Sequence, residues 1–504
     1  MADSKPDFGA GVPARILSDE PLAGHVDGKA VILARAGGRI CAVSGECTHL
    51  GAPLETGLVV GTEIRCPWHH ARFSLETGEA VGAPATEPLS CYTVEERDGT
   101  IRVADRAYLK PSRVAAEDNT KILIIGAGAA GYACADMLAR AGWGDRVTIL
   151  SADADAPYDR TFCSKHYLTG EKTRTECMMP TAGLGLGHPP TVRTRVNVSS
   201  FDVSRREVVT VEGERIGYST LVLATGAKPV MPDFGGSDQK AVYLLRTLAD
   251  ADALIEAART AKTVAILGAS FIGLEVAASL MARGLDVTVV GAGDVPLDSV
   301  LGEEAGHFVQ ALHEEKGVRF HLGRKVVDYD GTAATLDDGN MVQADMLVVG
   351  AGVKPRIELA KEAGLTLAPD EDGIAVDGGF ATSSEGVFAI GDVASYPDPR
   401  LDHPIRVEHW VHAQRQGQHL ARVLLGKTKA AFNDVPFFWS THHDIGIHYV
   451  GHVATPSVSR IEGSIEDGEF AIFLHEGGDD RALVTLERDL QSLEVEAIWE
   501  QRPL

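Results

Sequence analysis

A strand–turn–helix–strand pattern occurs twice in this chain of 504 residues, and it constrains the fold more than any other feature. Its first copy runs from the apolar segment 121–125 through Gly126-Ala-Gly128-Ala-Ala-Gly131 and an alanine-rich stretch to the apolar segment 147–150. Glycines at these three positions let the backbone approach a pyrophosphate, whose charge is favourable at the N-terminus of the following helix. The pattern therefore predicts a βαβ unit that binds a dinucleotide.

The second copy runs from 263–267 through Gly268-Ala-Ser270-Phe-Ile-Gly273 to 286–290. Ser270 stands in the place of the middle glycine, and its small side chain narrows the approach to the backbone without blocking it. Two such units predict two nested Rossmann-like α/β domains and hence two bound nucleotides. The alternative is a doubled α/β fold that binds no nucleotide, since a fold does not by itself imply a function.

A second internal similarity supports the duplication. The segment 221–229 reads Leu-Val-Leu-Ala-Thr225-Gly226-Ala-Lys-Pro, and the segment 346–355 reads Met-Leu-Val-Val-Gly-Ala-Gly352-Val-Lys-Pro. In each, an apolar strand is followed by glycine and then by a Lys-Pro pair. We therefore expect the two segments to occupy equivalent places in the two α/β domains.

Two short cysteine–histidine pairs, Cys47-Thr-His49 and Cys66-Pro-Trp-His69, lie in the first part of the chain. Two thiolates and two neutral imidazoles are the ligands of a mixed [2Fe–2S] centre, in which the cysteines hold one iron and the histidines the other. Zinc also accepts two cysteines and two histidines, but zinc fingers usually pair cysteine with cysteine and histidine with histidine. Because both pairs are mixed here, we favour the iron–sulfur centre. The next histidine, His70, is not expected to be a ligand, since adjacent side chains rarely point to one metal.

Composition argues against several kinds of partner. The 71 acidic residues outnumber the 47 basic ones and give a net charge of −24, which disfavours nucleic acid as a partner. No apolar run approaches the roughly 18 residues of a membrane helix, and residues 1–7 lack the basic and apolar regions of a signal peptide. We therefore expect a cytoplasmic protein with no membrane partner. The seven cysteines are too few and too scattered for a disulfide framework.

The order of the motifs resembles a known family. Besides the two glycine turns, the motifs are Tyr158-Asp-Arg160, Ser-Lys165, Ala-Thr-Gly226 and Val387-Phe-Ala-Ile-Gly-Asp392. This order resembles the two-dinucleotide flavoprotein reductases, and within them the FAD-dependent ferredoxin reductases of bacterial oxygenase systems and apoptosis-inducing factor. The cluster motif in front resembles the Rieske domain of the Rieske-containing apoptosis-inducing-factor-like proteins. The resemblance covers essentially the whole chain.

The resemblance implies roles for particular residues. Lys165, near the reactive edge of the flavin, and Glu275, near the nicotinamide, would be the catalytic residues. The cluster ligands would be Cys47, His49, Cys66 and His69. The residues expected to bind the two nucleotides are Gly126, Gly128, Gly131, Asp153, Arg160, Lys165, Thr225, Gly226, Gly268, Gly273, Glu275, Gly352, Gly391, Asp392, Glu408, His409 and Trp410.

The domain boundaries follow from the motifs and from changes in pattern along the chain. Short alternating strands broken by glycine turns precede the first α/β unit, and a polar stretch separates the two. The predicted domains are an all-β Rieske [2Fe–2S] domain at 1–105, a linker at 106–120, an FAD-binding domain at 121–245 and 371–430, an NAD(P)H-binding domain at 246–370 and an α+β domain at 431–504.

The implied activity is electron transfer from NADH. Hydride would pass from NADH to FAD, and electrons would then pass singly to the fused [2Fe–2S] cluster and on to a ferredoxin, a Rieske oxygenase or a cytochrome P450. NADH is preferred to NADPH because no arginine follows the second strand of the second unit, although Gly291-Ala-Gly293 also lacks the acidic residue typical of NAD sites. The oligomeric state, monomer or homodimer, stays open.

Two alternatives stay open. Cys163 lies in the flavin-side segment, where related disulfide reductases use a redox cysteine, so the second hypothesis is a Cys163-assisted NADH oxidase, peroxidase or disulfide reductase. The nearest partner, Cys177, is distant in sequence, and a packing thiol is the simpler reading of Cys163. The third hypothesis is a redox sensor similar to apoptosis-inducing factor, in which bound NADH changes dimerisation.

The cluster segment differs from the high-potential Rieske centres of respiratory complexes. Those centres carry an additional disulfide cysteine in each loop, whereas here Leu50 follows His49 and Trp68 precedes His69. Phe73 stands where a tyrosine hydroxyl would bond a ligating sulfur. Fewer hydrogen bonds to sulfur lower the potential, so we expect a value in the lower half of the known range of about −150 to +300 mV.

Overall fold

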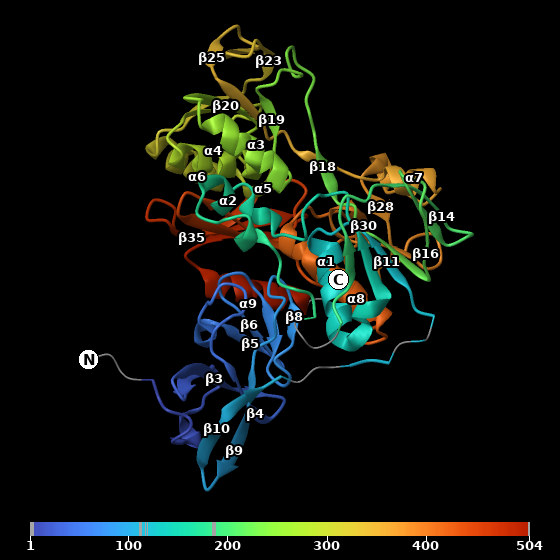
Figure 1. Cartoon of the computed structure of the whole chain (residues 1–504). Helices are drawn as coiled ribbons and strands as arrows, with labels where there is room; N and C mark the ends of the chain where they lie inside the picture. Colours follow the sequence, from blue (N-terminus) through green and yellow to red (C-terminus); the bar gives the residue numbers. More distant parts are fainter. Residues whose placement is uncertain (1–4, 110–112, 116, 118, 184–187, 502–504) are drawn as a thin grey trace.

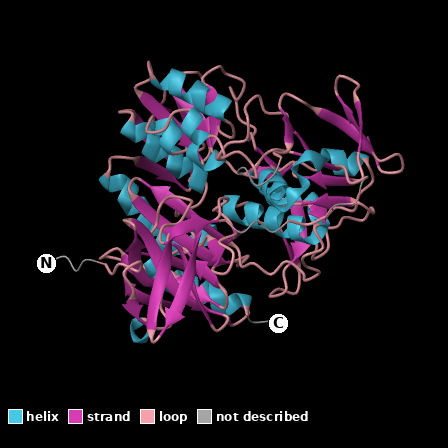
Figure 2. Ribbon diagram, turned by 60° about the horizontal axis from the view of Figure 1, so that its bottom comes forward, coloured by secondary structure: helices cyan, strands magenta, loops and turns pink. Residues whose placement is uncertain are grey.

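The computed structural model describes residues 5–109, 113–115, 117, 119–183 and 188–501. It contains an N-terminal all-β domain, two α/β domains and a C-terminal α+β domain (Figure 1), which confirms the predicted fold class. Figure 2 shows the helices gathered in the α/β parts, whereas the N-terminal domain is built of strands. Within the described ranges, no helix is long and apolar enough to cross a membrane.

Two antiparallel sheets form the N-terminal domain. Ile32 and Val43 of the larger sheet pack with Ile64 and Phe73 of the smaller one, and all four side chains are fully buried. The larger sheet has the order β1 (Val12–Pro13), β10 (Thr100–Tyr108), β9 (Cys91–Arg97), β4 (Arg39–Ser44), β3 (Lys29–Ala36), β2 (Leu22–Val26), and the smaller sheet the order β5 (Leu58–Val60), β6 (Glu63–Arg65), β7 (Arg72–Ser74), β8 (Ala80–Gly82).

The first α/β domain is built on a five-stranded parallel sheet. Every residue of its central strand β11 (Ile122–Ile125) is buried, as expected for a parallel strand that helices cover on both faces. Helix α1 (Ala129–Leu138) packs along α8 (Trp410–Leu424), so a segment far along the chain completes this domain. The strand order is β13 (Thr191–Arg193), β12 (Val147–Leu150), β11, β17 (Thr220–Leu223), β29 (Val387–Ala389).

The second α/β domain repeats this plan. Strand β26 (Met346–Val349) pairs in parallel with β20 (Thr263–Leu267) as β17 does with β11, so the duplicated segments occupy equivalent places, as the sequence predicted. Their Lys-Pro continuations, β18 (Ala227–Pro229) and β27 (Val353–Pro355), pair with each other and join the two domains. The strand order is β19 (Val242–Leu244), β26 (Met346–Val349), β20 (Thr263–Leu267), β21 (Asp286–Gly291), β22 (Arg319–Leu322), and the helices are α3 (Leu248–Ala258), α4 (Phe271–Ala282), α5 (Asp298–Leu301) and α6 (Glu303–Glu315).

Three element ends differ from the predicted domain boundaries. Strand β10 continues to Tyr108, past the boundary at 105. Strand β19 already belongs to the second parallel sheet at Val242, before the boundary at 246. The chain returns to the first domain before 371, because Ala360 of α7 (Glu358–Glu362) packs with Leu123. The predicted linker falls partly on residues 110–112, 116 and 118, outside the described residues.

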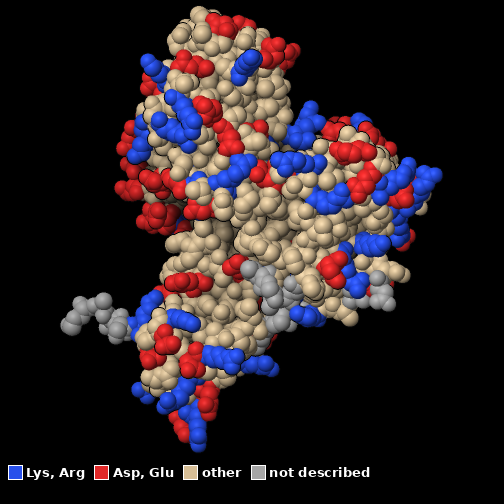
Figure 3. Space-filling view, viewed as in Figure 1, with Lys and Arg blue, Asp and Glu red and all other residues tan. Residues whose placement is uncertain are grey.

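The C-terminal domain lies between the N-terminal domain and the second α/β domain (Figure 1). Its helix α9 (Asp489–Glu500) contacts β5, and α8 contacts β8, so both helices face the N-terminal domain. On the face shown in Figure 3, acidic and basic side chains are mixed, and acidic ones gather along the left edge. The sheet of the C-terminal domain has the order β32 (Phe437–His442), β33 (Ile445–Gly451), β36 (Asp479–Leu486), β35 (Glu469–Glu476), β34 (Val458–Ser464).

Short elements complete the two α/β domains. They are α2 (His166–Thr169) and the small sheets β14 (Val198–Asp202), β15 (Glu207–Thr210), β16 (Arg215–Gly217); β23 (Val326–Tyr329), β24 (Ala333–Leu336), β25 (Met341–Gln343); and β28 (Ile374–Ala375), β30 (Ala394–Pro397), β31 (Pro404–Ile405).

Candidate functional site

A cavity of about 1170 Å³ runs from the first glycine turn to strand β32. It exceeds the roughly 300–1,000 Å³ typical of small-molecule pockets, so it has room for an elongated dinucleotide. Gly126 and Gly128 line one end, and Lys165, Glu275 and Trp439 line the other. Several separate predictions from the sequence therefore fall on one cavity.

The first glycine turn is shaped for close approach of a ligand. A Cβ atom on Gly126 would collide with the carbonyl oxygen of Ala224, and one on Gly131 with the carbonyl oxygen of Gly126. At Gly128, by contrast, a Cβ would meet no heavy atom within 4 Å, and no side chain caps α1 there. The free N–H groups at this helix end fit the pyrophosphate of FAD.

The second glycine turn has the same geometry with one difference. A Cβ on Gly268 would collide with the carbonyl oxygen of Gly350, and one on Gly273 with that of Gly268. Ser270 Oγ accepts a bond from Gly273 N at 3.2 Å and donates one to the Gly350 carbonyl at 2.8 Å. Ser270 thus caps α4, whereas no side chain caps α1 at Gly128.

The two predicted catalytic residues form an ion pair. Lys165 Nζ lies 2.9 Å from Glu275 Oε2. The same carboxylate accepts bonds from Ser164 Oγ at 2.6 Å and from Ser440 Oγ at 2.8 Å. Glu275 is only 6% exposed, so its charge has lost most of its contact with water. The ammonium and the two hydroxyl groups offset this desolvation, as a buried charge requires. The two serines were not predicted; Ser164 is the neighbour of Lys165, but nothing in the sequence pointed to Ser440.

Other predicted FAD residues line the cavity on several elements. Asp153 accepts a bond from Tyr158 Oη at 2.7 Å, and Asp392 pairs with Arg246 at 2.9 Å. Arg160 donates to the carbonyl of Arg246, and its guanidinium lies over the Tyr158 ring. These bonds hold the polar side chains in place along the cavity wall.

The segment before α8 supplies the opposite wall. Glu408 pairs with Arg406, and burial raises the pKa of Glu408. His409 stacks on Phe438 with ring centroids 3.8 Å apart, and burial lowers its pKa to about 4, so the imidazole is neutral. Of the other predicted residues, Thr225, Gly226, Gly352, Gly391 and Trp410 line the cavity, whereas Gly131, Gly268 and Gly273 pack inside their turns.

The four predicted cluster ligands come together on two matching loops. Cys47 N donates to the Ala52 carbonyl and Cys66 N to the Ala71 carbonyl, each at 2.8 Å. The Cys47 thiol donates to Cys66 Sγ, which raises the pKa of Cys47 and lowers that of Cys66. The rings of His49 and His69 lie 5.0 Å apart between centroids and nearly perpendicular.

This arrangement fits a [2Fe–2S] cluster. His49 Nδ1 is buried and has no hydrogen-bond partner, as expected for an atom that would ligate iron. Burial lowers the pKa of His49 to about 4 and that of His69 well below its ordinary value, so both rings are neutral. Among the described residues, no three metal-binding side chains are grouped around one point. In a Rieske centre each iron takes two protein ligands, so two cysteines and two histidines form a complete set.

Comparison with known proteins agrees with this geometry. Residues 120–417 match the family described as pyridine nucleotide-disulphide oxidoreductase, and residues 11–93 match the Rieske [2Fe-2S] domain. The chain belongs to the pyridine nucleotide-disulphide oxidoreductases. It carries a Rieske domain in front, and its cofactors are FAD, a [2Fe–2S] cluster and NADH.

Some relatives of this oxidoreductase match nearly the whole chain, and others match a smaller part of it. Apoptosis-inducing factor 3 of Homo sapiens is 30% identical over 479 residues, covering 91% of this chain and 78% of the relative. Rhodocoxin reductase of Rhodococcus erythropolis is 35% identical over 357 residues, covering 70% of this chain and 83% of the relative. The solved covalent putidaredoxin reductase–putidaredoxin complex matches with a TM-score of 0.71 and 27% identity, covering 77% of this chain and 94% of that chain.

The Rieske domain of the oxidoreductase is anchored by a buried glutamate on α9. Glu496 accepts from Arg415 of α8 at 2.6 Å and pairs with His70 Nδ1 at 2.8 Å and Arg65 at 3.7 Å. His70 also stacks on Phe437 with ring centroids 3.8 Å apart. The side chain of His70 therefore contacts the C-terminal domain.

A second set of ion pairs extends this contact. Arg72 lies 2.7 Å from Asp434 and 3.3 Å from Glu500, and Arg65 lies 2.6 Å from Glu500. These side chains are at most 13% exposed. In the sequence these residues resemble ordinary surface charges, so no pattern pointed to this interface.

Trp439 joins the two parts of the site in this oxidoreductase. Its ring lies 4.2 Å from that of His69 and 6.1 Å from that of His49, between centroids. Along β32, Phe437 stacks on His70 and Trp439 contacts His69. Phe438 and Ser440 contact His409 and Glu275. Strand β32 is thus the wall between cavity and cluster, and no motif in the sequence pointed to it.

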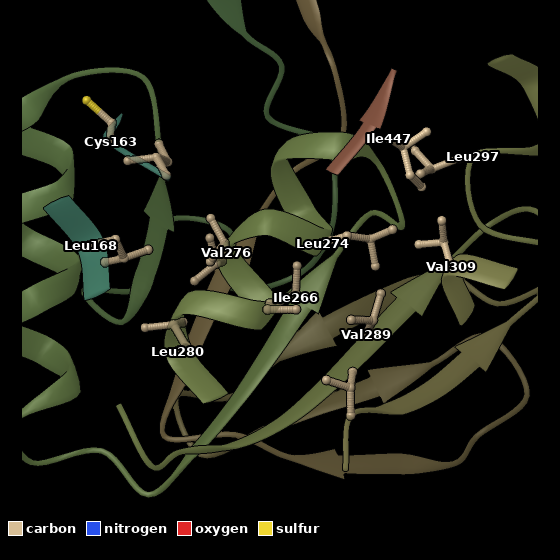
Figure 4. Packing of buried hydrophobic residues seen from close by; sticks show 14 of the residues in the cluster. Cys163, Leu168, Ile266, Leu274, Val276, Leu280, Val289, Leu297, Val309 and Ile447 are labelled. Atoms are coloured by element: carbon tan, nitrogen blue, oxygen red, sulfur yellow. The ribbon is translucent and has the colours of Figure 1, made fainter. Parts of the chain in front are cut away.

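Cys163 packs in the hydrophobic core of the oxidoreductase. Its side chain lies in the same buried cluster as Leu168 (Figure 4), and it also lines the cavity. Cys177 belongs to this buried cluster as well. Burial raises the pKa of Cys163 to about 12, so it is a thiol at neutral pH. Both cysteines are free. A redox role needs a thiolate, and the surroundings of Cys163 disfavour one.

Proposed function

We propose that the chain passes electrons from NADH, through FAD in the large cavity, to its own Rieske cluster and on to an external redox protein. The observation that supports this most directly is the position of Trp439. Its indole lines the cavity on one side and contacts the ligand candidates His69 and His49 on the other.

FAD, when bound, accepts a hydride from a nicotinamide and releases electrons singly, which is the chemistry that joins NADH to a one-electron cluster. The protein contributes binding and electrostatics. Gly126 and Gly128 would hold the pyrophosphate, and Asp392 a hydroxyl of the ribityl chain. Lys165 presents a cation to the cavity, and Glu275 fixes it there. A cation at this position stabilises negative charge that develops during hydride transfer.

The docked Rieske domain makes the second step intramolecular. A domain on a short flexible linker would meet the flavin at an effective concentration in the millimolar range. Here the buried pairs of Glu496 with Arg415 and of Arg72 with Asp434 hold the domain against α8 and α9. The distance from the cavity to the cluster is therefore set by packing, and electron transfer does not wait for a domain movement.

The external acceptor is proposed from the relatives' names and from the cluster chemistry. Relatives are named as ferredoxin–NAD reductase components and as putidaredoxin reductase. We therefore propose a ferredoxin, a Rieske oxygenase or a cytochrome P450 as the acceptor, and NADH as the donor. Comparing kcat/KM for NADH and NADPH tests the donor, and NADPH preferred by tenfold would contradict the proposal.

The test of the central proposal is anaerobic reduction of the holoenzyme by NADH. Optical spectra follow the flavin and EPR spectra follow the cluster. We expect both centres to become reduced. A Cys66→Ser control removes one cluster ligand, so it should keep flavin reduction and lose the Rieske EPR signal. A wild-type cluster that stays oxidised while the flavin is fully reduced would refute internal transfer.

A further inference from the structure

Three histidines form a line next to the cavity. His442 ends β32, His313 lies on α6, and His443 follows His442. His442 and His313 are fully buried, and His443 is partly exposed. His313 Nε2 and His442 Nδ1 are 3.2 Å apart and share a hydrogen bond, and the rings of His313 and His443 lie 4.8 Å apart between centroids.

The free nitrogens of these rings suggest what the line can do. His442 Nε2, His313 Nδ1 and His443 Nε2 are buried and have no hydrogen-bond partner. Each inner ring therefore has one nitrogen in the shared bond and the other free. A neutral imidazole of this kind can accept a proton on one nitrogen and release one from the other. Burial lowers the pKa of His313 to about 2 and that of His442 to about 3, so both rings are neutral at rest.

The inner end of the line lies beside the ion pair in the cavity. His442 is two residues after Ser440, so both side chains point to the same face of β32. Ser440 donates to Glu275, and the ammonium of Lys165 is near enough for its charge to act on His442.

At the outer end the charges of Lys316 and Asp444 act on His443, and Phe320 of β22 packs edge-on to His313. The described charged groups around the line are therefore Lys165 inside and Lys316 and Asp444 outside. The line thus leads from the ion pair in the cavity to a partly exposed ring.

We propose that His442, His313 and His443 conduct a proton from the Lys165–Glu275 pair to solvent, a role that rests on the proposed function. Oxidation of NADH yields NAD⁺, two electrons and one proton. The electrons leave singly through the cluster to an external one-electron acceptor, and the line of histidines offers the proton a separate route. The two routes separate at β32, with Trp439 on one face and His442 on the other.

Each inner ring gains one proton and releases another, so the proton transfer leaves both rings neutral. Lys165 gives a proton to His442 Nε2 through one internal water, and the proton released in the cavity restores the ammonium. His442 passes the proton of Nδ1 to His313 Nε2. His313 passes the proton of Nδ1 to His443, which releases one to bulk water. A buried water beside an unpaired polar atom, here His442 Nε2, is an ordinary feature of protein interiors.

Stopped-flow measurement of a single NADH turnover tests this, with a pH indicator and an excess of a one-electron acceptor, ferricyanide, which takes both electrons in turn. In the wild type, proton release should keep pace with reduction of the ferricyanide. In His442→Gln and His313→Gln it should slow by at least about tenfold, because positioned proton-transfer groups contribute about 10²–10⁴-fold. His307→Gln, an exposed position on the same helix, should change nothing. Added imidazole should restore the rate in His442→Ala, which a purely structural role would not allow.

A second readout uses the apoprotein. Histidine-selective ¹⁵N NMR should show both inner rings neutral between about pH 6 and 8, and His313→Gln should change the tautomer ratio of His442. Unchanged proton release in both glutamine variants, or charged inner rings, would overturn the relay. Should those variants not fold, His443→Gln at the partly exposed end should still slow proton release. Failure of NADH to reduce the wild-type cluster would instead refute the proposed function, so the two failures are distinguishable.

Discussion

The indole ring of Trp439 lies 4.2 Å from the imidazole ring of His69, between ring centroids, and is tilted by 44°. Trp439 also lines the cavity in which Lys165 and Glu275 form an ion pair. Because side chains alternate along a strand, β32 gives one face to the Rieske domain and the other to the cavity. One strand thus lies between the cavity and the candidate cluster ligand His69.

Replacing Trp439 should slow electron transfer to the cluster without slowing hydride transfer. Trp439→Ala removes the ring between the cavity and His69, and we expect about a tenfold slower reduction of the cluster, equivalent to about 1.4 kcal/mol of activation free energy. Trp439→Phe keeps an aromatic ring, so its rate of cluster reduction should lie between those of the wild type and Trp439→Ala. Rapid-freeze EPR measures the cluster, and stopped-flow absorbance the flavin. Trp68→Ala, an exposed tryptophan in the cluster loop, is the control. Equal rates in Trp439→Ala and wild type would contradict this role.

Replacing Lys165 should slow reduction of the flavin. Lys165→Met removes the cation held 2.9 Å from Glu275, and we expect about a 10²-fold lower limiting rate, the effect of one preorganised electrostatic donor. Stopped-flow absorbance at saturating NADH measures it. Lys172→Met lies in the same segment but does not line the cavity, and it should leave the rate unchanged. A normal limiting rate in Lys165→Met would show that the cation has no part in hydride transfer.

The local features of this protein could be predicted from its sequence, whereas the contacts between domains could not. The glycine turns and the cluster loops are short because their chemistry needs neighbouring residues. Their spacing, together with the strands and turns around them, therefore predicted Gly126 and Cys47 as site residues. The pairing of Lys165 with Glu275 and Ser440 joins three distant segments. Arg415 and Glu496 resemble ordinary helix surface charges in sequence, and only tertiary packing buries them.

Breaking the Arg415–Glu496 pair should destabilise the docked Rieske domain. Arg415→Met leaves a buried carboxylate without its closest cation, which typically costs about 3–5 kcal/mol. The double variant Arg415→Met with Glu496→Leu removes both charges and should recover most of this loss. Urea unfolding measures the free energies. Arg205→Met at an exposed pair should change stability by less than about 0.5 kcal/mol. Equal losses in the single and double variants would contradict a role for the charge pair.

The same glutamate should make stability depend on pH. Burial alone would raise the pKa of Glu496, but Arg415, His70 and Arg65 together lower it well below the ordinary 4.5. A carboxyl with a lowered pKa stabilises the fold above its unfolded pKa and loses that contribution as pH falls below it. We therefore expect the melting temperature to fall on acidification from about pH 5. Glu496→Gln should show a shallower fall over this window, and a parallel fall in both proteins would exclude Glu496 as the cause.

The cluster should have a low potential for a Rieske centre. Backbone N–H groups of His49 and Leu50 donate to the Cys47 sulfur, and those of Trp68 and His69 donate to the Cys66 sulfur. Phe73 is fully buried and offers no hydroxyl. Hydrogen bonds to sulfur raise the potential, so the missing hydroxyl predicts a midpoint in the lower half of the range of about −150 to +300 mV. EPR-monitored redox titration measures it. Phe73→Tyr should raise the midpoint if the new hydroxyl reaches a sulfur, and a wild-type value above about +200 mV would contradict the prediction.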